Sequence, residues 1–230
     1  MPPATRRDAF LAGVRSILPI LLGVFPFGVI AGVAAVEAGL DTLQAIALSP
    51  IVFAGASQLA TVDLVARDAA PVVIVLTALV INARFGMYSA SLAPWLRGAQ
   101  PAAKGLAAYL LTDQAFAVSV IHFERDQQDL GLRTAFFFGA AVPLWVTWQV
   151  SSVVGVVIGA GVPPEWSLDF AIPLVFMALL FPAIKDRGTR AAALVAGAAA
   201  VVLIGLPLNL GLLAAAALGI SAGVLAEVTR

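Results

Sequence analysis

The sequence contains no cysteine and only one histidine, His122. Without cysteine the chain can form neither a disulfide framework nor a thiolate metal site, and one imidazole is too few for a histidine site. It also lacks the Gly-x-x-x-x-Gly-Lys-Ser/Thr loop that holds nucleotide phosphates, which excludes ATP hydrolysis by a P-loop mechanism. We therefore expect no metal and no cofactor.

Charge is scarce as well. Only 11% of the 230 residues are charged and 61% are hydrophobic, against about 25% and 45–50% in soluble domains. The 13 basic and 13 acidic residues cancel, which argues against nucleic acid as a partner. The composition predicts a polytopic membrane protein whose solvent is the lipid bilayer.

The apolar runs predict an all-α bundle of seven or eight transmembrane spans in one membrane domain, residues 1–230. A span needs about 20 apolar residues, and the run from Phe10 to Val36 is too long for a signal peptide. The last stretch is broken by glycine and proline near 205–211, so it is either two short helices or one span with a re-entrant half. The expected spans are residues 10–36, 42–66, 71–95, 104–123, 133–160, 168–184 and 190–226.

The distribution of Lys and Arg predicts a cytoplasmic amino terminus. With that orientation, ten basic residues fall in the inside segments and only two, Arg97 and Lys104, fall outside. The ten are Arg6, Arg7, Arg15, Arg67, Arg125, Arg133, Lys185, Arg187, Arg190 and, if there are eight spans, Arg230.

A proline, a glycine and two polar side chains interrupt the second apolar run at residues 49–58. Pro50 lacks an N–H and clashes with the carbonyl four residues earlier, so we expect a kink or break between about Ile46 and Gly55. Backbone groups freed in this way mark substrate sites in several transporters. The alternative is a kink relieved by neighbouring helices, with Ser57 and Gln58 serving only to join helices.

Polar side chains also lie near the middle of three predicted spans. A charge there is costly, so Arg84 and Asp113 each need a partner or water. Because their predicted depths match and their spans are consecutive, we expect them to form an ion pair, either functional or purely structural. The other polar residues at this depth are Gln58, Asn82, Thr112 and Gln114. Two deep tryptophans, Trp145 and Trp148, either line a cavity or pack.

Three Gly-x-x-x-Gly spacings predict close contact between helix backbones. They are Gly28/Gly32, Gly155/Gly159 and Gly219/Gly223. A faint internal repeat relates residues 49–53 to 172–176 and residues 23–26 to 139–143, at offsets of roughly 120 residues, and suggests two units in parallel orientation.

Several short motifs occur in an order that resembles the AzlC family of bacterial inner-membrane permeases. They are Pro26-Phe27-Gly28, Phe53-Ala54-Gly55-Ala56-Ser57-Gln58, Asn82-Ala83-Arg84, Ser91-Leu92-Ala93-Pro94 and Leu111-Thr112-Asp113. The resemblance is clearest from about Ala9 to Ile121. It implies the large subunit of a branched-chain amino acid exporter in the inner membrane, acting with a small AzlD-type membrane subunit.

An aliphatic amino acid needs an anion site, a cation site and an apolar pocket at one depth. We expect Arg84, or N–H groups near Gly55, to bind the carboxylate, and Asp113 to bind the ammonium or a coupling proton. The remaining candidate site residues are Ser57, Gln58, Asn82 and Gln114 for hydrogen bonds and Phe27 and Phe53 for the apolar wall.

The sequence allows two hypotheses about function other than a transporter. A channel or a scaffold for a partner subunit would lack a saturable substrate site. An intramembrane serine protease would pair Ser57 with His122, but their predicted depths differ by roughly 7 Å, too far for proton transfer. We expect the protein not to be an enzyme.

Overall fold

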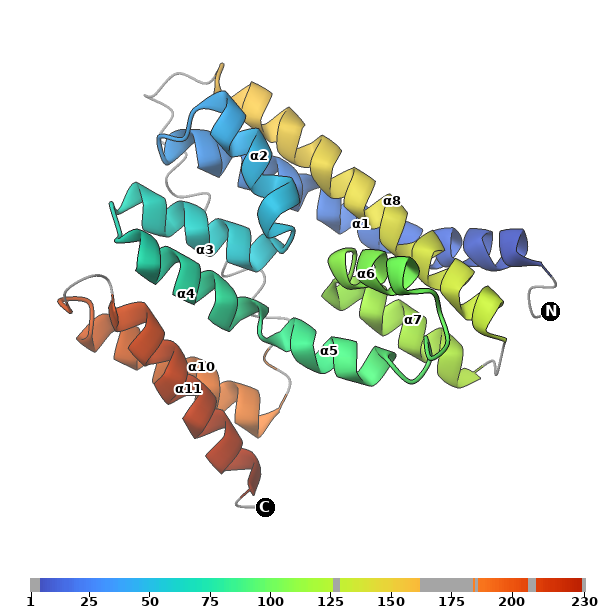
Figure 1. The fold of residues 1–230 in the computed structure, drawn as a ribbon. Coiled ribbons are helices and arrows are strands. Elements are labelled where there is room, and N and C mark those ends of the chain that lie inside the picture. Colours follow the sequence, from blue (N-terminus) through green and yellow to red (C-terminus); the bar gives the residue numbers. More distant parts are fainter. Residues whose placement is uncertain (1–4, 126–128, 162–183, 185, 207–209, 229–230) are drawn as a thin grey trace.

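The computed structural model describes residues 5–125, 129–161, 184, 186–206 and 210–228, and within these ranges the regular elements are all helical, as predicted (Figure 1). Expected residues 168–184 and the repeat segment 172–176 lie outside this part, apart from residue 184. The helices are α1 (Arg6–Glu37), α2 (Thr42–Val52), α3 (Gly55–Ala66), α4 (Pro71–Asn82), α5 (Arg84–Leu92), α6 (Pro101–Tyr109), α7 (Asp113–Arg125), α8 (Leu130–Gly159), α10 (Arg187–Val202) and α11 (Leu210–Val228).

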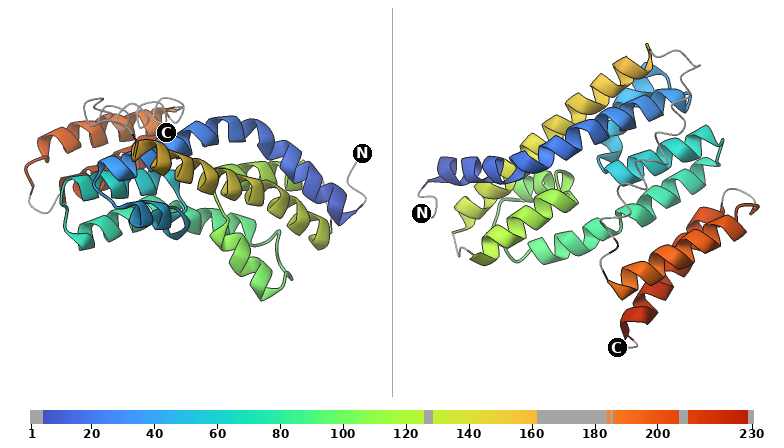
Figure 2. Two further views of the ribbon diagram at one scale, coloured as in Figure 1. Left: turned by 90° about the horizontal axis from the view of Figure 1, so that it is seen from above. Right: turned by 180° about the vertical axis from the view of Figure 1, so that it is seen from behind.

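The two longest helices, α1 and α8, lie side by side and run in the same direction (Figures 1 and 2). Thr5 caps α1 by accepting from the Asp8 N–H, and Asp129 caps α8 by accepting from the Leu132 N–H. We call the two ends of the molecule the Arg6 end and the Glu37 end, after the ends of α1.

Glycines bring the backbones of α1 and α8 into contact. A Cβ on Gly32 would clash with the Ser152 carbonyl, and one on Gly155 would clash with the Val29 carbonyl. We call this contact the glycine seam; it consists of Gly13, Gly28, Gly32, Gly139 and Gly155. The prediction of close packing at Gly28/Gly32 and Gly155/Gly159 is therefore confirmed, as it is for Gly219/Gly223, which pack against Ala192 and Ala196 of α10.

Residues 42–66 do not cross the molecule. Helix α2 enters from the Glu37 end and stops at Val52, and α3 starts at Gly55 and returns to the same end (Figure 1). Leu59 and Val62 of α3 accordingly pack in one cluster with the last turns of α1. The predicted break beside Pro50 is confirmed, and the two half-helices fold back as a hairpin and do not continue as one straight helix, so a span over residues 42–66 is not confirmed.

Residues 104–123 form a second hairpin, which opens to the opposite end. Helix α6 runs inward to Tyr109 and α7 runs back from Asp113. The start of α6 shares a surface hollow with Arg6 and Gly131, and Phe123 near the end of α7 packs edge-on against Phe136 near the start of α8. The two hairpins thus enter from opposite ends and their tips meet in the middle (Figure 2).

This arrangement changes where the loops lie. Arg97 and Lys104, expected on the side opposite the amino terminus, belong to the Arg6 end, whereas Arg67 belongs to the Glu37 end. There Arg67 pairs with Asp63 at 3.0 Å. This placement differs from the expectation because the expectation counted each hairpin as a complete span.

Four helical segments of the described chain are long and apolar enough to cross a membrane, so the prediction of seven or eight spans is not confirmed. They are Arg6–Glu37, Pro71–Leu92, Leu130–Gly159 and Leu210–Val228. The second of these is α4 followed by α5, with a bend at Ala83. The last predicted stretch is two helices, since α10 ends at Val202 and α11 begins at Leu210 and packs antiparallel to it.

Segments 23–26 and 139–143, which carry one of the two repeat matches, lie on the parallel helices α1 and α8. The second copy of the other match lies outside the described residues, so the internal repeat stays a prediction.

Candidate functional site

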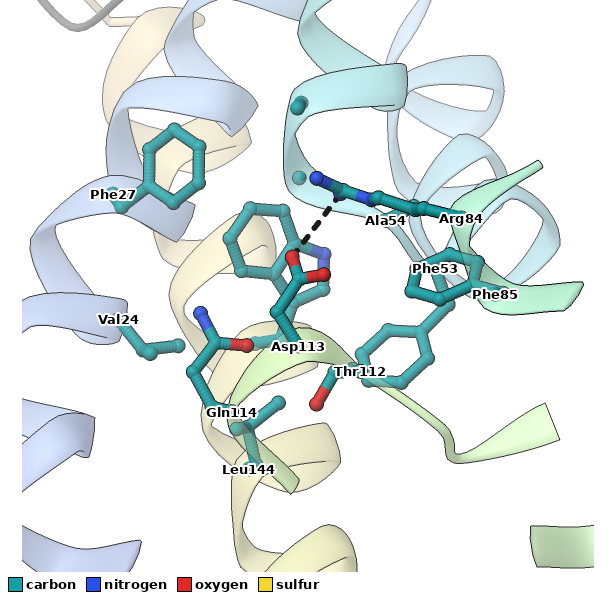
Figure 3. A pocket seen from close by; sticks show the side chains of 13 residues that line it. Val24, Phe27, Phe53, Ala54, Arg84, Phe85, Thr112, Asp113, Gln114 and Leu144 are labelled. Carbon is teal, nitrogen blue, oxygen red and sulfur yellow. Dashed lines mark ion pairs between the residues drawn. The ribbon is translucent and has the colours of Figure 1, made fainter. Parts of the chain in front are cut away.

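A central pocket lies where the two hairpin tips meet the bend between α4 and α5 (Figure 3). Its volume is about 240 Å³, below the roughly 300–1,000 Å³ of pockets that hold drug-sized ligands, so it suits a small molecule. The lining residues are Val24, Phe27, Phe53, Ala54, Gly55, Ala56, Arg84, Phe85, Thr112, Asp113, Gln114, Leu144 and Trp148.

Three helices begin at this pocket, namely α3 at Gly55, α5 at Arg84 and α7 at Asp113. The first turn of a helix carries N–H groups without intrahelical partners and the positive end of the helix dipole. No side chain caps α3 or α5, and their first residues line the cavity. The α7 start is capped instead, because the Thr112 hydroxyl accepts from the Ala115 N–H at 3.2 Å. The uncapped start of α3 therefore gives the pocket an electropositive edge made of backbone. Helix α5 contributes less, because it follows α4 through helical Ala83 and its Gly86 N–H donates to the Ala83 carbonyl.

The predicted ion pair is present in the pocket. Arg84 Nη2 lies 3.2 Å from Asp113 Oδ2, and the two side chains are 31% and 39% exposed, respectively (Figure 3). Arg84 Nε and Asp113 Oδ1 are buried and have no hydrogen-bond partner among the described residues. The Tyr88 hydroxyl also interacts with the Asp113 carboxyl. A buried unmatched polar atom costs about 1–3 kcal/mol, so a side-chain rotation that exposed Arg84 Nε and Asp113 Oδ1 to the cavity would let a ligand satisfy both atoms.

The opposite wall of the pocket is aromatic. The rings of Phe27 and Trp148 meet edge to face, with centroids 5.2 Å apart. Gly55 lies against both rings, and a Cβ there would approach Phe27 Cε1 to 2.6 Å and Trp148 Cη2 to 2.8 Å. Only glycine fits this position without moving a ring.

A hydrogen-bonded link joins the two hairpin tips. Tyr109 at the end of α6 donates its hydroxyl proton to the Pro50 carbonyl of α2 at 2.9 Å, and it accepts from Trp145 Nε1 at 3.1 Å. Tyr109 also packs on Phe53, with ring centroids 6.0 Å apart. We call this the tip link; it satisfies a carbonyl near the break in α2, as a chain interrupted at membrane depth requires.

Six of the nine predicted site residues line the pocket: Gly55, Arg84, Asp113, Gln114, Phe27 and Phe53. The other three do not. Ser57 Oγ lies 3.5 Å from the Ala78 carbonyl, Gln58 Oε1 accepts from Trp148 Nε1 at 3.2 Å, and Asn82 ends α4 outside the lining. For Ser57 and Gln58 the reason is the helical turn, which directs the residues after Ala56 away from the cavity.

Sequence reasoning did not assign Trp148, Phe85, Val24 or Leu144 to the site. Trp148 gave a signal, because a tryptophan deep within an apolar run is unusual for an aromatic belt. Among the described residues no group of three His, Cys, Asp or Glu side chains comes together as a metal site would.

The geometry argues against the pairing of Ser57 with His122. Ser57 lies in the first turn of α3, whereas His122 lies near the end of α7 and stacks on Phe136 with ring centroids 3.7 Å apart. Because the two hairpins open to opposite ends, these residues lie on different sides of the central pocket.

The long apolar helices, the two hairpins and the polar pocket between them define an integral membrane protein with a central pocket. The chain belongs to the AzlC family, whose profile (AzlC protein) matches residues 19–162.

Relatives share this length and class. The chain is 27% identical over 213 residues to the inner membrane protein YgaZ of Escherichia coli (strain K12), covering 89% of this chain and 86% of that protein. It is 30% identical over 226 residues to an "uncharacterized membrane protein" of Archaeoglobus fulgidus, covering 95% and 96%. A Helicobacter pylori (strain 26695) membrane protein is 25% identical over 178 residues, covering 77% and 76%. No solved structure matches the chain.

Proposed function

We propose that this protein is the large subunit of a secondary transporter that exports branched-chain amino acids across the bacterial inner membrane. The observation that carries the proposal is the pair between Arg84, at the bend from α4 to α5, and Asp113, at the tip of the second hairpin, which keeps one buried donor and one buried acceptor without a partner among the described residues. A zwitterion offers the matching acceptor and donor in one small molecule.

The pocket matches each part of such a substrate. Its carboxylate would accept from Arg84 Nε and from N–H groups at the start of α3, and its ammonium would donate to Asp113 Oδ1. The aliphatic side chain would lie against Phe27, Trp148 and Leu144. Gln114 would add a neutral hydrogen bond.

The hairpins supply the elements that transport needs. Broken helices whose ends meet at mid-membrane are characteristic of secondary transporters, in which one part rocks against another around a fixed site. Because the two hairpins enter from opposite ends, each tip borders the pocket from one side of the membrane. Opening one side at a time would give alternating access without ATP.

The charge distribution supports a cytoplasmic amino terminus. Arg6 shares a hollow with residues 98–100, 103, 130 and 131, Arg133 lies over Trp95, and Phe123 packs on Phe136. The basic residues at or next to these positions, and so at the Arg6 end, are Arg6, Arg7, Arg97, Lys104, Arg125 and Arg133. In the described part of the Glu37 end, Arg67 is the basic residue and is paired with Asp63. The positive-inside rule then assigns the Arg6 end to the cytoplasm.

We propose in addition that a small AzlD-type membrane subunit acts together with this chain, on the strength of the family to which the chain belongs.

Efflux measurements test the function. Cells or proteoliposomes are preloaded with labelled valine, leucine, isoleucine or methionine, with the chain present or absent and with the AzlD-type subunit present or absent. We expect saturable efflux that falls in Asp113→Asn. Efflux that rises linearly with concentration would indicate a channel instead, and no efflux under any combination would indicate a scaffold.

A further inference from the structure

Trp148 lines the central pocket, but it takes no part in the proposed binding of the substrate's charged groups. It lies midway along α8, is only 4% exposed and borders the cavity with its ring. Its contacts are specific: Nε1 donates to Gln58, the ring edge meets Phe27, and Cη2 faces the space above Gly55.

Gln58 determines how that ring is held. Its side chain is fully buried, and its Oε1 lies 3.2 Å from Trp148 Nε1. An indole nitrogen can only donate, so the ring loses its single hydrogen bond if the acceptor is removed. Gln58 does not line the cavity, and its influence on a ligand must therefore pass through Trp148.

Gly55 also restricts where the rings of Phe27 and Trp148 can lie. The Cβ of any larger residue would lie within 2.8 Å of both rings, closer than real Cβ contacts, so the rings would have to move away from α3. The positions of Phe27 and Trp148 are thus set by a glycine on one side and by the Gln58 hydrogen bond on the other.

We propose that Trp148, with Gly55 and Phe27, sets the size limit for the apolar side chain of the substrate, and that Gln58 is a positioning residue that holds the indole in place. This inference rests on the proposed transport of amino acids and adds the residues that decide which ones fit. It changes the role of Gln58, which we had expected to bind the substrate directly.

The test measures the ratio of labelled phenylalanine efflux to valine efflux for each variant. Trp148→Phe replaces the indole by a smaller ring, and we expect the ratio to rise about tenfold, since one methylene in an apolar pocket changes discrimination by roughly 10–200-fold. Gln58→Leu should raise the ratio in the same direction by a smaller factor. In the double variant Gln58→Leu should add nothing, because the indole through which it acts is absent.

Gly55→Ala tests the opposite direction. The added methyl group takes up space between α3 and the two rings at the apolar side of the pocket, so the ratio should fall below that of the wild type. Combining Gly55→Ala with Trp148→Phe should bring the ratio back toward the wild-type value, because the smaller ring removes one of the two clashes.

Trp145→Phe is the matched control. Trp145 lies one turn earlier on the same helix, donates to Tyr109 and does not line the pocket. In Trp145→Phe the ratio of phenylalanine efflux to valine efflux should equal that of the wild type, even if total efflux falls.

The outcomes separate this inference from the proposed function. Unchanged ratios in Trp148→Phe and Gln58→Leu, with efflux still present, would overturn the inference and leave the transporter standing. A wild-type protein that moves neither amino acid would overturn both. Equal changes in Trp148→Phe and Trp145→Phe would show that general packing, not contact with the substrate, controls the ratio.

Discussion

The α1/α8 pair and the two hairpins differ in how their helices pack and in how their polar groups are satisfied. Along the glycine seam the backbones of α1 and α8 touch, and the buried Ser151 hydroxyl of α8 is satisfied within its own helix, where it donates to the Trp148 carbonyl at 3.1 Å. At the hairpin tips the helices are interrupted, and Asp113 at one tip and Arg84 at the neighbouring bend of α4 and α5 keep polar atoms without partners among the described residues. The continuous pair resists change in shape, whereas the interrupted elements provide a place for a ligand.

The difference follows from lipid as a solvent. Lipid tails are as apolar as leucine, so helices associate in a membrane through close packing, which small residues permit. Interrupted backbone is tolerated only where protein or a water-filled cavity satisfies the freed groups. A rigid seam beside two hairpins therefore lets a polar pocket exist at mid-membrane without exposing it to lipid.

The largest effect on stability should come from adding a methyl group within the glycine seam. Gly32→Ala places a methyl group against the Ser152 carbonyl and within 3.0 Å of backbone atoms of residues 155 and 156, and backbone cannot move aside as a side chain can. We expect a loss of about 3 kcal/mol or more, seen as little monodisperse protein in fluorescence-detected size-exclusion chromatography.

Gly23→Ala is the control for that variant. Gly23 lies on the same helix, but nothing among the described residues lies within 4 Å of a Cβ built there. Replacing a helical glycine by alanine should stabilise by up to about 1 kcal/mol. Equal yields for Gly32→Ala and Gly23→Ala would contradict the seam as the rigid part of the molecule.

The second effect concerns the ion pair. Asp113→Asn leaves Arg84 without its charge partner, but both groups face the cavity and are about one third exposed, so the cost in stability should be about 1 kcal/mol or less. We expect folded protein in near-normal amounts and efflux reduced at least tenfold.

The double variant Asp113→Asn with Arg84→Gln decides the role of the pair. It removes both charges and keeps hydrogen-bonding groups, so it should fold but remain inactive if the pair binds substrate or a coupling proton. Efflux at the wild-type rate would mean that the pair only joins helices.

A smaller effect is expected at the tip link. Tyr109→Phe removes the proton that the Pro50 carbonyl accepts and should cost about 1 kcal/mol, the net value of one hydrogen bond. Thermal unfolding in detergent would measure it. Trp145→Phe keeps the bond from Tyr109 to Pro50 and should cost less; the reverse order would show that the two hairpin tips are not held by this carbonyl.

The sequence predicted the class, the all-helical fold, the break beside Pro50 and the Arg84–Asp113 pair, because each has a strong local cause. It did not predict the hairpins, since two half-helices have the same length and hydropathy as one span. In the second hairpin no proline or glycine marks the tip, and the signal was Thr112, a capping residue interpreted only as part of a polar site.

Two basic residues gave a signal in the sequence from which the hairpins could have been predicted. Arg97 and Lys104 were the exceptions to the positive-inside pattern, and re-entrant hairpins remove both exceptions by returning the chain to the Arg6 end. The site residues Ser57 and Gln58 were misplaced for a related reason, because which side of α3 faces the cavity depends on the hairpin and not on depth.

The smallest perturbation tests this topology directly. The natural chain lacks cysteine, so single exposed positions can be labelled with a membrane-impermeant thiol reagent after Thr42→Cys, Ala66→Cys or Gln100→Cys, with little expected effect on efflux. Complete spans would place positions 42 and 66 on opposite sides, whereas a hairpin places both on the side opposite a fluorescent tag at the amino terminus. We expect 42 and 66 to react from the periplasm, and the amino-terminal tag and position 100 to report the cytoplasm. Labelling of positions 42 and 66 from different sides would show that residues 42–66 cross the bilayer, and the central pocket would then lack one of the two tips that form it.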